Sequence, residues 1–269
     1  MRLLVASDLD RTLIYSAAAA GTPPPADLVT VEVYQGRPIS FVTAAAAALL
    51  TELSGRTPVV PVTTRTPEQL ARVRLPGAPG PYAVAANGGV LLVDGEPDRD
   101  WTARVAGAVG AVAPLAEAVA VLTAATDPAW AKEPRIAAEL FVYTVLDRAA
   151  LPADVVPGLV AWAGPAGWTV SLQGRKLYLV PAPLTKSAAV AEVARRSGAD
   201  VVLSAGDSLL DIDLLAAADR GVRPGHGEIA DSGWSAPHVD ALTATGARAG
   251  EEVLRWFAAR LAELAVSPR

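Results

Sequence analysis

Short apolar runs alternate with longer amphipathic stretches over much of the chain. Most of these runs are rich in Val, Leu and Ala, which is typical of strands buried on both faces of a sheet. The predicted strands comprise residues 2–7, 29–34, 57–64, 82–87 and 200–206. The predicted helices comprise residues 40–53, 67–74, 185–198, 208–218 and 250–265, the first three starting at Ser40, Pro67 and Thr185. Strands and helices in alternation predict an α/β fold with a Rossmann-like, doubly wound parallel sheet.

The middle third of the chain breaks this alternation. Hairpins are predicted at residues 90–101 and 168–180, where Gly-containing turns separate two apolar segments. The pattern between them indicates an Ala-rich helical region, a strand and a short helix, at residues 105–125, 137–147 and 152–163. This order of elements predicts an α+β unit that interrupts the parallel-sheet domain.

The chain therefore divides into three predicted segments. A first core segment covers residues 1–90, an α+β cap domain covers 91–182, and a second core segment covers 183–269. The Asn-Gly-Gly sequence at residues 87–89 favours a turn, so we expect a hinge into the cap there.

Composition narrows the possible partners. The 269 residues are 52% hydrophobic and carry a net charge of −5, without a run of Lys and Arg that could track a nucleic acid backbone. The sequence contains no cysteine, which suits a reducing compartment, and its first apolar run is too short for a signal peptide. The most apolar later segment, residues 105–125, contains Pro114 and Glu117 and does not resemble a membrane span. We expect a cytoplasmic protein without nucleic acid or membrane partners.

Polar residues gather where the predicted core strands end. Ligands of doubly wound sheets bind beyond the carboxyl ends of the strands, so these residues are candidates for one site. They are Asp8 and Asp10 after the first strand, Thr63, Thr64 and Arg65 after the third, Asp207, Ser208 and Asp211 after the last, and Lys186 at a helix start. Asp8 and Asp10 stand two residues apart, so on an extended strand both face one side.

Several of these residues also have ordinary structural interpretations. The two acids could form a turn, Ser208 or Asp207 could cap a helix, and Thr63 could be a strand former. Lys186 is harder to explain in that way. It follows the predicted N-cap Thr185, where the helix dipole disfavours a cation, so an anionic group is expected nearby.

Taken in order, these motifs resemble those of the haloacid dehalogenase (HAD) superfamily of phosphatases. The resemblance covers the whole predicted core, through DLDRT at residues 8–12, Thr63, Lys186 and GDSLLD at residues 206–211. The position of the insert resembles the branch with a large α+β cap, which includes Cof-like and sucrose-phosphate phosphatases. Weaker similarity is found to phosphatases of bacterial tellurium-resistance and stress-response gene clusters.

The resemblance implies a role for each motif. Asp8 would be the nucleophile that takes the phosphoryl group, and Asp10 the general acid and base. Thr63 and Lys186 would contact the phosphoryl oxygens. Mg²⁺ would be held by Asp8, the backbone carbonyl of Asp10, and Asp207, and this ion suits carboxylate, phosphate and water oxygens. Asp211 and Ser208 would support these ligands.

The chain departs from the usual motifs at three places. Arg11 stands where the large-cap branch often has Gly, and Thr64 stands where the sequence is usually Thr-Gly-Arg. Leu210 replaces an Asn that usually precedes the last acid, so a contact made by that Asn is not expected here. His226 and His238 lack partners at metal-ligand spacing and are given no catalytic role.

The sequence predicts a phosphatase for a small organic phosphomonoester, such as a sugar phosphate or a nucleotide-like metabolite. Arg65, Arg135, Arg175 and Lys176 are candidate substrate contacts, although a solvated hairpin turn would also explain the last two. Trp101, Trp130 and Trp168 are expected to anchor the core.

Three other functions use similar residues. A phosphomutase or phosphotransferase would share the core motifs, and a binding protein could share the fold. A receiver domain also combines Asp, Thr and Lys, but it lacks a large insert.

Overall fold

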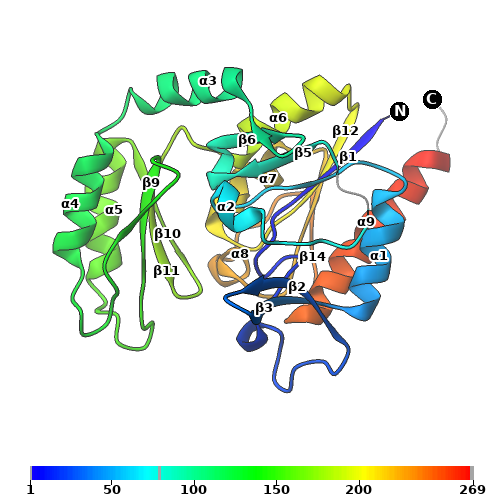
Figure 1. The fold of residues 1–269 in the computed structure, drawn as a ribbon, viewed down its shortest axis with the longest axis horizontal. Coiled ribbons are helices and arrows are strands. Elements are labelled where there is room, and N and C mark those ends of the chain that lie inside the picture. The colour runs from blue at the N-terminus through cyan, green and yellow to red at the C-terminus, as the bar shows by residue number, and fades with distance from the viewer. Residues whose placement is uncertain (1, 78–79, 267–269) are drawn as a thin grey trace.

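A five-stranded parallel sheet lies at the centre of the protein, and the computed structural model describes residues 2–77 and 80–266 (Figure 1). The strand order is β14-β13-β12-β1-β4. The bounds are Leu3–Ser7 for β1, Val59–Pro61 for β4, Val201–Ala205 for β12, Arg220–Arg223 for β13 and Val239–Ala241 for β14. Leu3 pairs with Val201, and Ser7 pairs with both Ala205 and Pro61. Three strands therefore end at one level, as expected for residues that share a site.

Helices cover both faces of this sheet, which confirms the doubly wound α/β prediction. They are α1 (Ala44–Ser54) and α9 (Ala247–Val266) on one face, with α6 (Lys186–Ser197) and α7 (Ile212–Ala217) on the other. Alternate residues of β1 point to opposite faces of the sheet. Leu4 packs in the hydrophobic cluster with α6 and α7, and Val5 packs in the hydrophobic cluster with α1 and α9. Both side chains are fully buried, so the continuous apolar run is explained by burial on two sides.

A two-stranded antiparallel sheet replaces the start of one predicted helix. Strands β2 (Leu28–Tyr34) and β3 (Arg37–Thr43) pair along most of their length. Residues 40–43 therefore belong to a strand, and the prediction that the helix starts at Ser40 was wrong. Helix α1 begins instead at Ala44, where the Thr43 hydroxyl accepts a hydrogen bond from the Ala46 amide at 3.1 Å. A β-branched and aromatic run before the alanines favours the strand.

The first predicted hairpin pairs with a core strand. Strand β5 (Tyr82–Ala85) pairs antiparallel with β6 (Val90–Val93), which pairs with β7 (Glu96–Pro97). A single parallel bridge, Val62 to Val84, connects this small sheet to the end of β4. The chain from residue 82 to residue 97 thus lies beside the core sheet and not in the second lobe.

The second lobe is built on a four-stranded antiparallel sheet in the order β10-β11-β9-β8 (Figure 1, left). Its strands are β8 (Arg135–Ala137), β9 (Phe141–Val145), β10 (Trp168–Gln173) and β11 (Lys176–Pro181). Helices α4 (Leu115–Ala125) and α5 (Val155–Ala166) pack on it, and α3 (Arg99–Val109) leads to it along the top of Figure 1. This lobe is the α+β cap of the predicted fold class.

The limits given for the three segments stay predictions, although residues 91–97, assigned to the cap, belong to the small sheet beside the core. The outer ends of the segments, residues 1 and 269, lie outside the described residues. Short elements complete the chain: η1 (Ala17–Ala19), α2 (Pro67–Leu70), η2 (Ala86–Gly88), η3 (Leu209–Asp211) and α8 (Glu228–Ser232). Among the described residues, no helix combines the length and the apolar character needed to cross a bilayer.

The chain leaves β5 and returns to α6 at neighbouring points. Asn87, in a left-handed conformation, donates from Nδ2 to the Leu184 carbonyl at 2.8 Å. Gly88 lies so close to the returning chain that an added Cβ would sit 2.1 Å from the Thr185 carbonyl oxygen. This close approach requires glycine and ties together two segments almost one hundred residues apart.

Candidate active site

The candidate site lies at the carboxyl ends of β1, β4 and β12. Asp8 follows β1, Thr63 and Arg65 follow β4, and Asp207 follows β12. Lys186 opens α6, on the same side of the sheet. Because the three strands end at one level, these predicted residues are brought together by the sheet register.

Lys186 is the buried cation of the site. Its side chain is 0% exposed, and its Nζ donates to Asp8 Oδ1 at 2.7 Å and to Asp211 Oδ1. These two carboxylates outweigh the effect of burial and raise the pKa of Lys186, so the residue stays charged. Asp213 also accepts a hydrogen bond from the Ser187 amide at 2.7 Å. The anions explain why a lysine is tolerated at this helix start.

Asp211 holds the loop after β12. Its Oδ2 accepts hydrogen bonds from the Asp207 amide, the Ser208 amide and the Ser208 hydroxyl, at 3.1, 2.9 and 2.8 Å. Its Oδ1 accepts from Lys186. Four donors thus contact the two oxygens of this carboxylate, so Asp211 fixes the positions of Lys186 and of the loop at residues 207–208.

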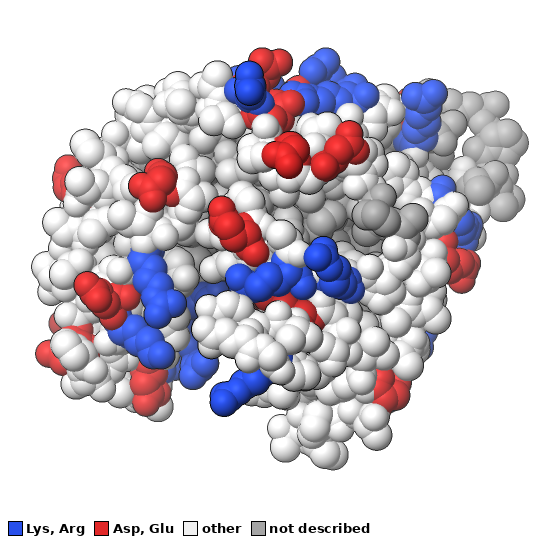
Figure 2. Space-filling model, viewed as in Figure 1, with Lys and Arg blue, Asp and Glu red and all other residues white. Residues whose placement is uncertain are grey.

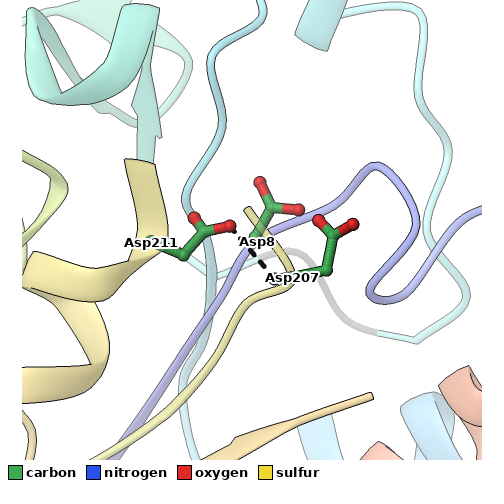
Figure 3. A group of neighbouring side chains, drawn as sticks. All are labelled: Asp8, Asp207 and Asp211. Atoms are coloured by element: carbon green, nitrogen blue, oxygen red, sulfur yellow. Dashed lines mark hydrogen bonds between the residues drawn. The ribbon is translucent and has the colours of Figure 1, made fainter. Parts of the chain in front are cut away.

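Three buried acids lie within reach of one cation. Carboxylate oxygens of Asp8, Asp207 and Asp211 lie within 4.8 Å of one another. Figure 3 shows Asp8 and Asp207 pointing to the same side, whereas Asp211 points across toward Asp8. Burial raises the pKa of Asp8 to about 7, with Asp211 adding to the rise and Lys186 opposing it. Burial and the neighbouring acids also raise the pKa of Asp207 well above its usual range.

This set of donors fits a divalent cation. Asp8 and Asp207 each have an oxygen without an ammonium partner, and their mutual repulsion would be relieved by positive charge between them. Two buried carboxylates with hard oxygen donors suit Mg²⁺, which keeps several waters and binds few protein ligands. Asp211, already saturated by donors, suits the role of support better than that of a ligand.

Asp10 is held by an arginine and not by Lys186. Arg65 donates from Nε and Nη2 to the two oxygens of Asp10 at 2.7 and 2.8 Å, and from Nη1 to Glu32 at 2.8 Å. Burial acts to raise the pKa of Asp10, but the hydrogen bonds and charge of Arg65 outweigh it and lower this pKa. Arg65 was predicted as a substrate contact, and in this structure its donors are taken by Asp10 and Glu32.

Thr63 is fully buried beside this pair. Its Oγ1 accepts a hydrogen bond from the Arg65 amide at 3.1 Å, which leaves the hydroxyl proton available for another acceptor. A phosphoryl oxygen at the strand ends would be such an acceptor.

The departures from the usual motifs have local explanations. Arg11 adopts a left-handed conformation (φ 66°), the conformation that glycine adopts most easily, and its Nε lies 3.4 Å from Asp207 Oδ2. Leu210, in place of the usual Asn, is 6% exposed and packs in the apolar cluster beneath α6 and α7. Lys186 and Asp211 hold their positions without the missing amide.

The cap sheet docks on the loop that carries Asp207. Gln173 Nε2 donates to Ser208 Oγ at 3.1 Å. Glu228, at the start of α8, accepts from the Ser171 hydroxyl and the Leu172 amide in the cap and from the Leu209 amide in the core, at 3.0, 3.0 and 3.2 Å. The cap therefore contacts the same short loop that Asp211 organises.

One face of the cap sheet looks toward the candidate site. Ser171 pairs with Tyr178, Tyr178 with Tyr143, and Tyr143 with Arg135, so these four side chains share one face. Lys176 lies two residues before Tyr178 and belongs to that face. Figure 2 shows Lys and Arg side chains gathered where the left lobe meets the core.

The remaining predicted residues lie at the edges of this region. Arg175 and Arg135 are exposed, the first in the β10–β11 turn and the second on the edge strand β8. His226 donates from Nε2 to the Arg11 carbonyl oxygen at 2.8 Å and forms no hydrogen bond with Asp8, Asp207 or Asp211. Trp101 and Trp168 are buried and donate to backbone carbonyls, consistent with anchoring roles.

Glu32, Gln173 and Glu228 were missed in the sequence. Glu32 lies on an ordinary-looking strand and Glu228 follows a Gly-rich turn, so neither belongs to a recognisable motif. Gln173 adjoins the predicted bases of the hairpin, but nothing in the sequence indicates its contact with Ser208.

A doubly wound core with an inserted α+β cap and acids at the strand ends is the architecture of HAD superfamily phosphatases, and comparisons with solved structures show the same fold. The sucrose-phosphatase of Synechocystis sp. PCC6803, solved with sucrose and phosphate, matches with a TM-score of 0.65 and 19% identity, over 96% of this chain and 99% of that chain. The C-terminal domain of trehalose-6-phosphate phosphatase from C. albicans matches with a TM-score of 0.57 and 13% identity, over 96% and 93%.

A sugar phosphatase of HAD subclass IIB matches with a TM-score of 0.57 and 14% identity, over 96% of this chain and 99% of that chain. A scan of protein-family models and a search of curated proteins find no match. The fold of this chain is therefore that of the HAD phosphatases with a large cap.

Proposed function

We propose that the protein is a Mg²⁺-dependent phosphatase that hydrolyses a small organic phosphomonoester through an aspartyl-phosphate on Asp8. The observation that carries this proposal is the contact of Asp8 with the buried Lys186, beside Asp207 and two residues before Asp10. The fold shared with sucrose-phosphate and trehalose-6-phosphate phosphatases supports it. A cytoplasmic location and a sugar phosphate or nucleotide-like substrate belong to the same proposal.

In the first step, a carboxylate oxygen of Asp8 attacks phosphorus and the bond to the leaving oxygen breaks. Lys186 and the Thr63 hydroxyl hold phosphoryl oxygens, and they stabilise the charge of the transition state. Asp10 gives its proton to the leaving oxygen, a role that contributes on the order of 10² to 10⁴ in rate.

In the second step, Asp10 takes a proton from water, and this water attacks phosphorus and releases phosphate from Asp8. The pairing with Arg65 lowers the pKa of Asp10 and favours its basic form, which suits this step. Proton donation in the first step requires a protonated Asp10, so we propose that Arg65 loosens its hold when substrate binds. Arg65 would then be free to contact the substrate.

Asp8, Asp207 and the Asp10 carbonyl would hold Mg²⁺, with Asp211 and Ser208 fixing the loop. The ion would supply positive charge that offsets repulsion between the carboxylates and the phosphoryl group. Arg11 adds a further positive charge beside Asp207.

The test is phosphate release from an aryl phosphate and a panel of sugar phosphates and nucleotides, with and without Mg²⁺. Release by the purified protein and none by Asp8→Asn is the expected result, provided that circular dichroism shows the variant to be folded. Equal release by both proteins would contradict the proposed nucleophile. Transfer of phosphate to a second hydroxyl instead of water would indicate a phosphotransferase.

A further inference from the structure

Lys176 is a cation of the cap that the proposed reaction does not use. It opens β11 on the face that looks toward the core and is only partly exposed. Its ammonium lies 5.6 Å from the centre of the Tyr143 ring and interacts with the Tyr178 hydroxyl. An aromatic face and a phenolic hydroxyl hold the cation through partial charges, without a formal opposite charge.

The acid that acts on Lys176 is already paired. Asp10 acts electrostatically on Lys176, but Arg65 occupies both oxygens of Asp10. Within residues 2–77 and 80–266, Lys176 forms no ion pair with any carboxylate. The Tyr178 hydroxyl, Asp10 and Tyr143 raise the pKa of Lys176, with burial opposing them, so the residue stays charged. Its ammonium can therefore form a charge-assisted hydrogen bond with an anionic ligand.

Two tyrosines give this cation an apolar floor. The rings of Tyr143 and Tyr178 stack at 5.5 Å, with 29° between their planes. The Tyr178 hydroxyl also interacts with the Thr64 side chain, next to Thr63. The floor thus extends from Lys176 toward the expected phosphoryl position.

Lys176 lies on the side of the leaving group. In the proposed reaction Asp10 protonates the leaving oxygen, so the organic part of the substrate continues from Asp10. Lys176 is the cap cation whose charge acts on Asp10. It is therefore placed to meet a group attached to the leaving oxygen, and not the transferred phosphoryl group held by Lys186.

We propose that Lys176 forms an anion subsite, and that the preferred substrate is a phosphomonoester whose leaving group carries a second negative charge, a carboxylate or another phosphate. This inference rests on the proposed phosphatase function. The carbon skeleton between the two anionic groups would lie on Tyr143 and Tyr178.

Matched pairs of phosphomonoesters test the subsite. The pairs are 6-phosphogluconate with glucose 6-phosphate, and 3-phosphoglycerate with glycerol 3-phosphate, with an aryl phosphate as a reference for phosphatase activity. We expect the carboxylate-bearing member to have the higher kcat/KM by about 10- to 100-fold, the size typical of a charge-assisted hydrogen bond. Lys176→Met should abolish this ratio, and Lys176→Arg should restore part of it.

Lys132→Met is the matched control, because Lys132 is an exposed base of the same lobe, and among the described residues its side chain forms no hydrogen bond or ion pair. It should leave the ratio unchanged. Aryl phosphate hydrolysis with equal kcat/KM for both members of each pair would overturn the anion subsite and leave the phosphatase proposal intact.

Binding separates the subsite from turnover. Calorimetry with Asp8→Asn should show tighter binding of the carboxylate-bearing member, and this preference should disappear in the double variant with Lys176→Met. Equal binding of both members would overturn the subsite, whether or not the protein hydrolyses any phosphate.

Discussion

The core and the cap differ in whether their charged side chains form ion pairs. In the core, Lys186 contacts Asp8 and Asp211, and Arg65 contacts Asp10 and Glu32. In the described part of the cap, the predicted substrate residues Lys176, Arg175 and Arg135 form no ion pair with a carboxylate.

This difference assigns separate tasks to the two regions. Charged side chains that are already fixed by ion pairs lose little conformational freedom when a phosphoryl group binds. Electrostatic catalysis requires charges that are preorganised in this way. Bases without acid partners remain available for a ligand. In the proposed reaction, the core would carry out the phosphoryl transfer and the cap would determine which substrate is accepted.

Replacing lysine by methionine in the core and in the cap should give the largest difference in stability and activity. Lys186→Met leaves Asp8 and Asp211 buried without their cation, and breaking a buried ion pair in this way costs about 3–5 kcal/mol of stability. Phosphatase activity should fall by on the order of 10³-fold or more, as expected when part of a unit of catalytic residues is lost. Urea unfolding and phosphate release measure the two effects.

Lys176→Met serves as the comparison, since it removes a cation that has no acid partner. We expect it to lower stability by less than Lys186→Met does. Equal loss of stability in the two variants would contradict the division between a paired core and an unpaired cap.

The metal site should respond to Asp207. Mg²⁺ at about one hundred times its dissociation constant should stabilise the folded protein by roughly 2.7 kcal/mol, because it binds the folded state. Thermal unfolding with and without Mg²⁺ measures this effect. Asp207→Asn should remove most of the shift, whereas Asp231→Asn, an exposed acid of the same side of the core, should keep it.

Arg65→Met tests the positioning of Asp10. Asp10 and Glu32 would each lose a charged partner, and we expect a stability loss of about 1–3 kcal/mol because Glu32 keeps Arg72 and Ser40. The kcat value should fall by about 10²-fold if Asp10 loses its orientation. Arg175→Met is the matched change in the cap and should alter kcat far less. An unchanged kcat in Arg65→Met would contradict the positioning role.

The smallest expected effect concerns the contact between the regions. Glu228→Gln keeps the size of the side chain but weakens the hydrogen bonds to Ser171 and Leu172, which together should be worth about 1 kcal/mol. We expect KM to rise several-fold with a smaller change in kcat, because the closed cap would be less populated. Small-angle scattering would show whether the average dimensions increase, and a kcat loss at constant KM would argue against a docking role.

The sequence predicted the parts of the site that depend on local pattern. Asp8 and Asp207 stand at the ends of apolar strands, and a parallel sheet brings such ends together whatever the details of packing. Lys186 was recognised from its unfavourable position at a helix start. Their contacts agree with the geometry expected of one site, although their catalytic roles remain predictions.

The parts that the sequence did not reveal depend on distant contacts. Ser40 resembled a helix start, but pairing of β3 with β2 prevailed, and this pairing places Ser40 against Glu32. The contact of Glu228 with the cap joins segments 57 residues apart along the chain, measured from Ser171. No local pattern encodes such a contact, because it exists only once two separately built surfaces meet.

The register of the central strand affects the order in which the core and the cap can fold during synthesis. All four strands of the cap sheet lie within residues 135–181, so they can pair before the chain after residue 181 has been synthesised. Strand β1 is made before the cap, but the partner of its Leu3 is Val201, which is made after the cap. Asp8 therefore leaves the ribosome long before Lys186 and Asp207, and the core must wait for its last strands while the cap can already be folded.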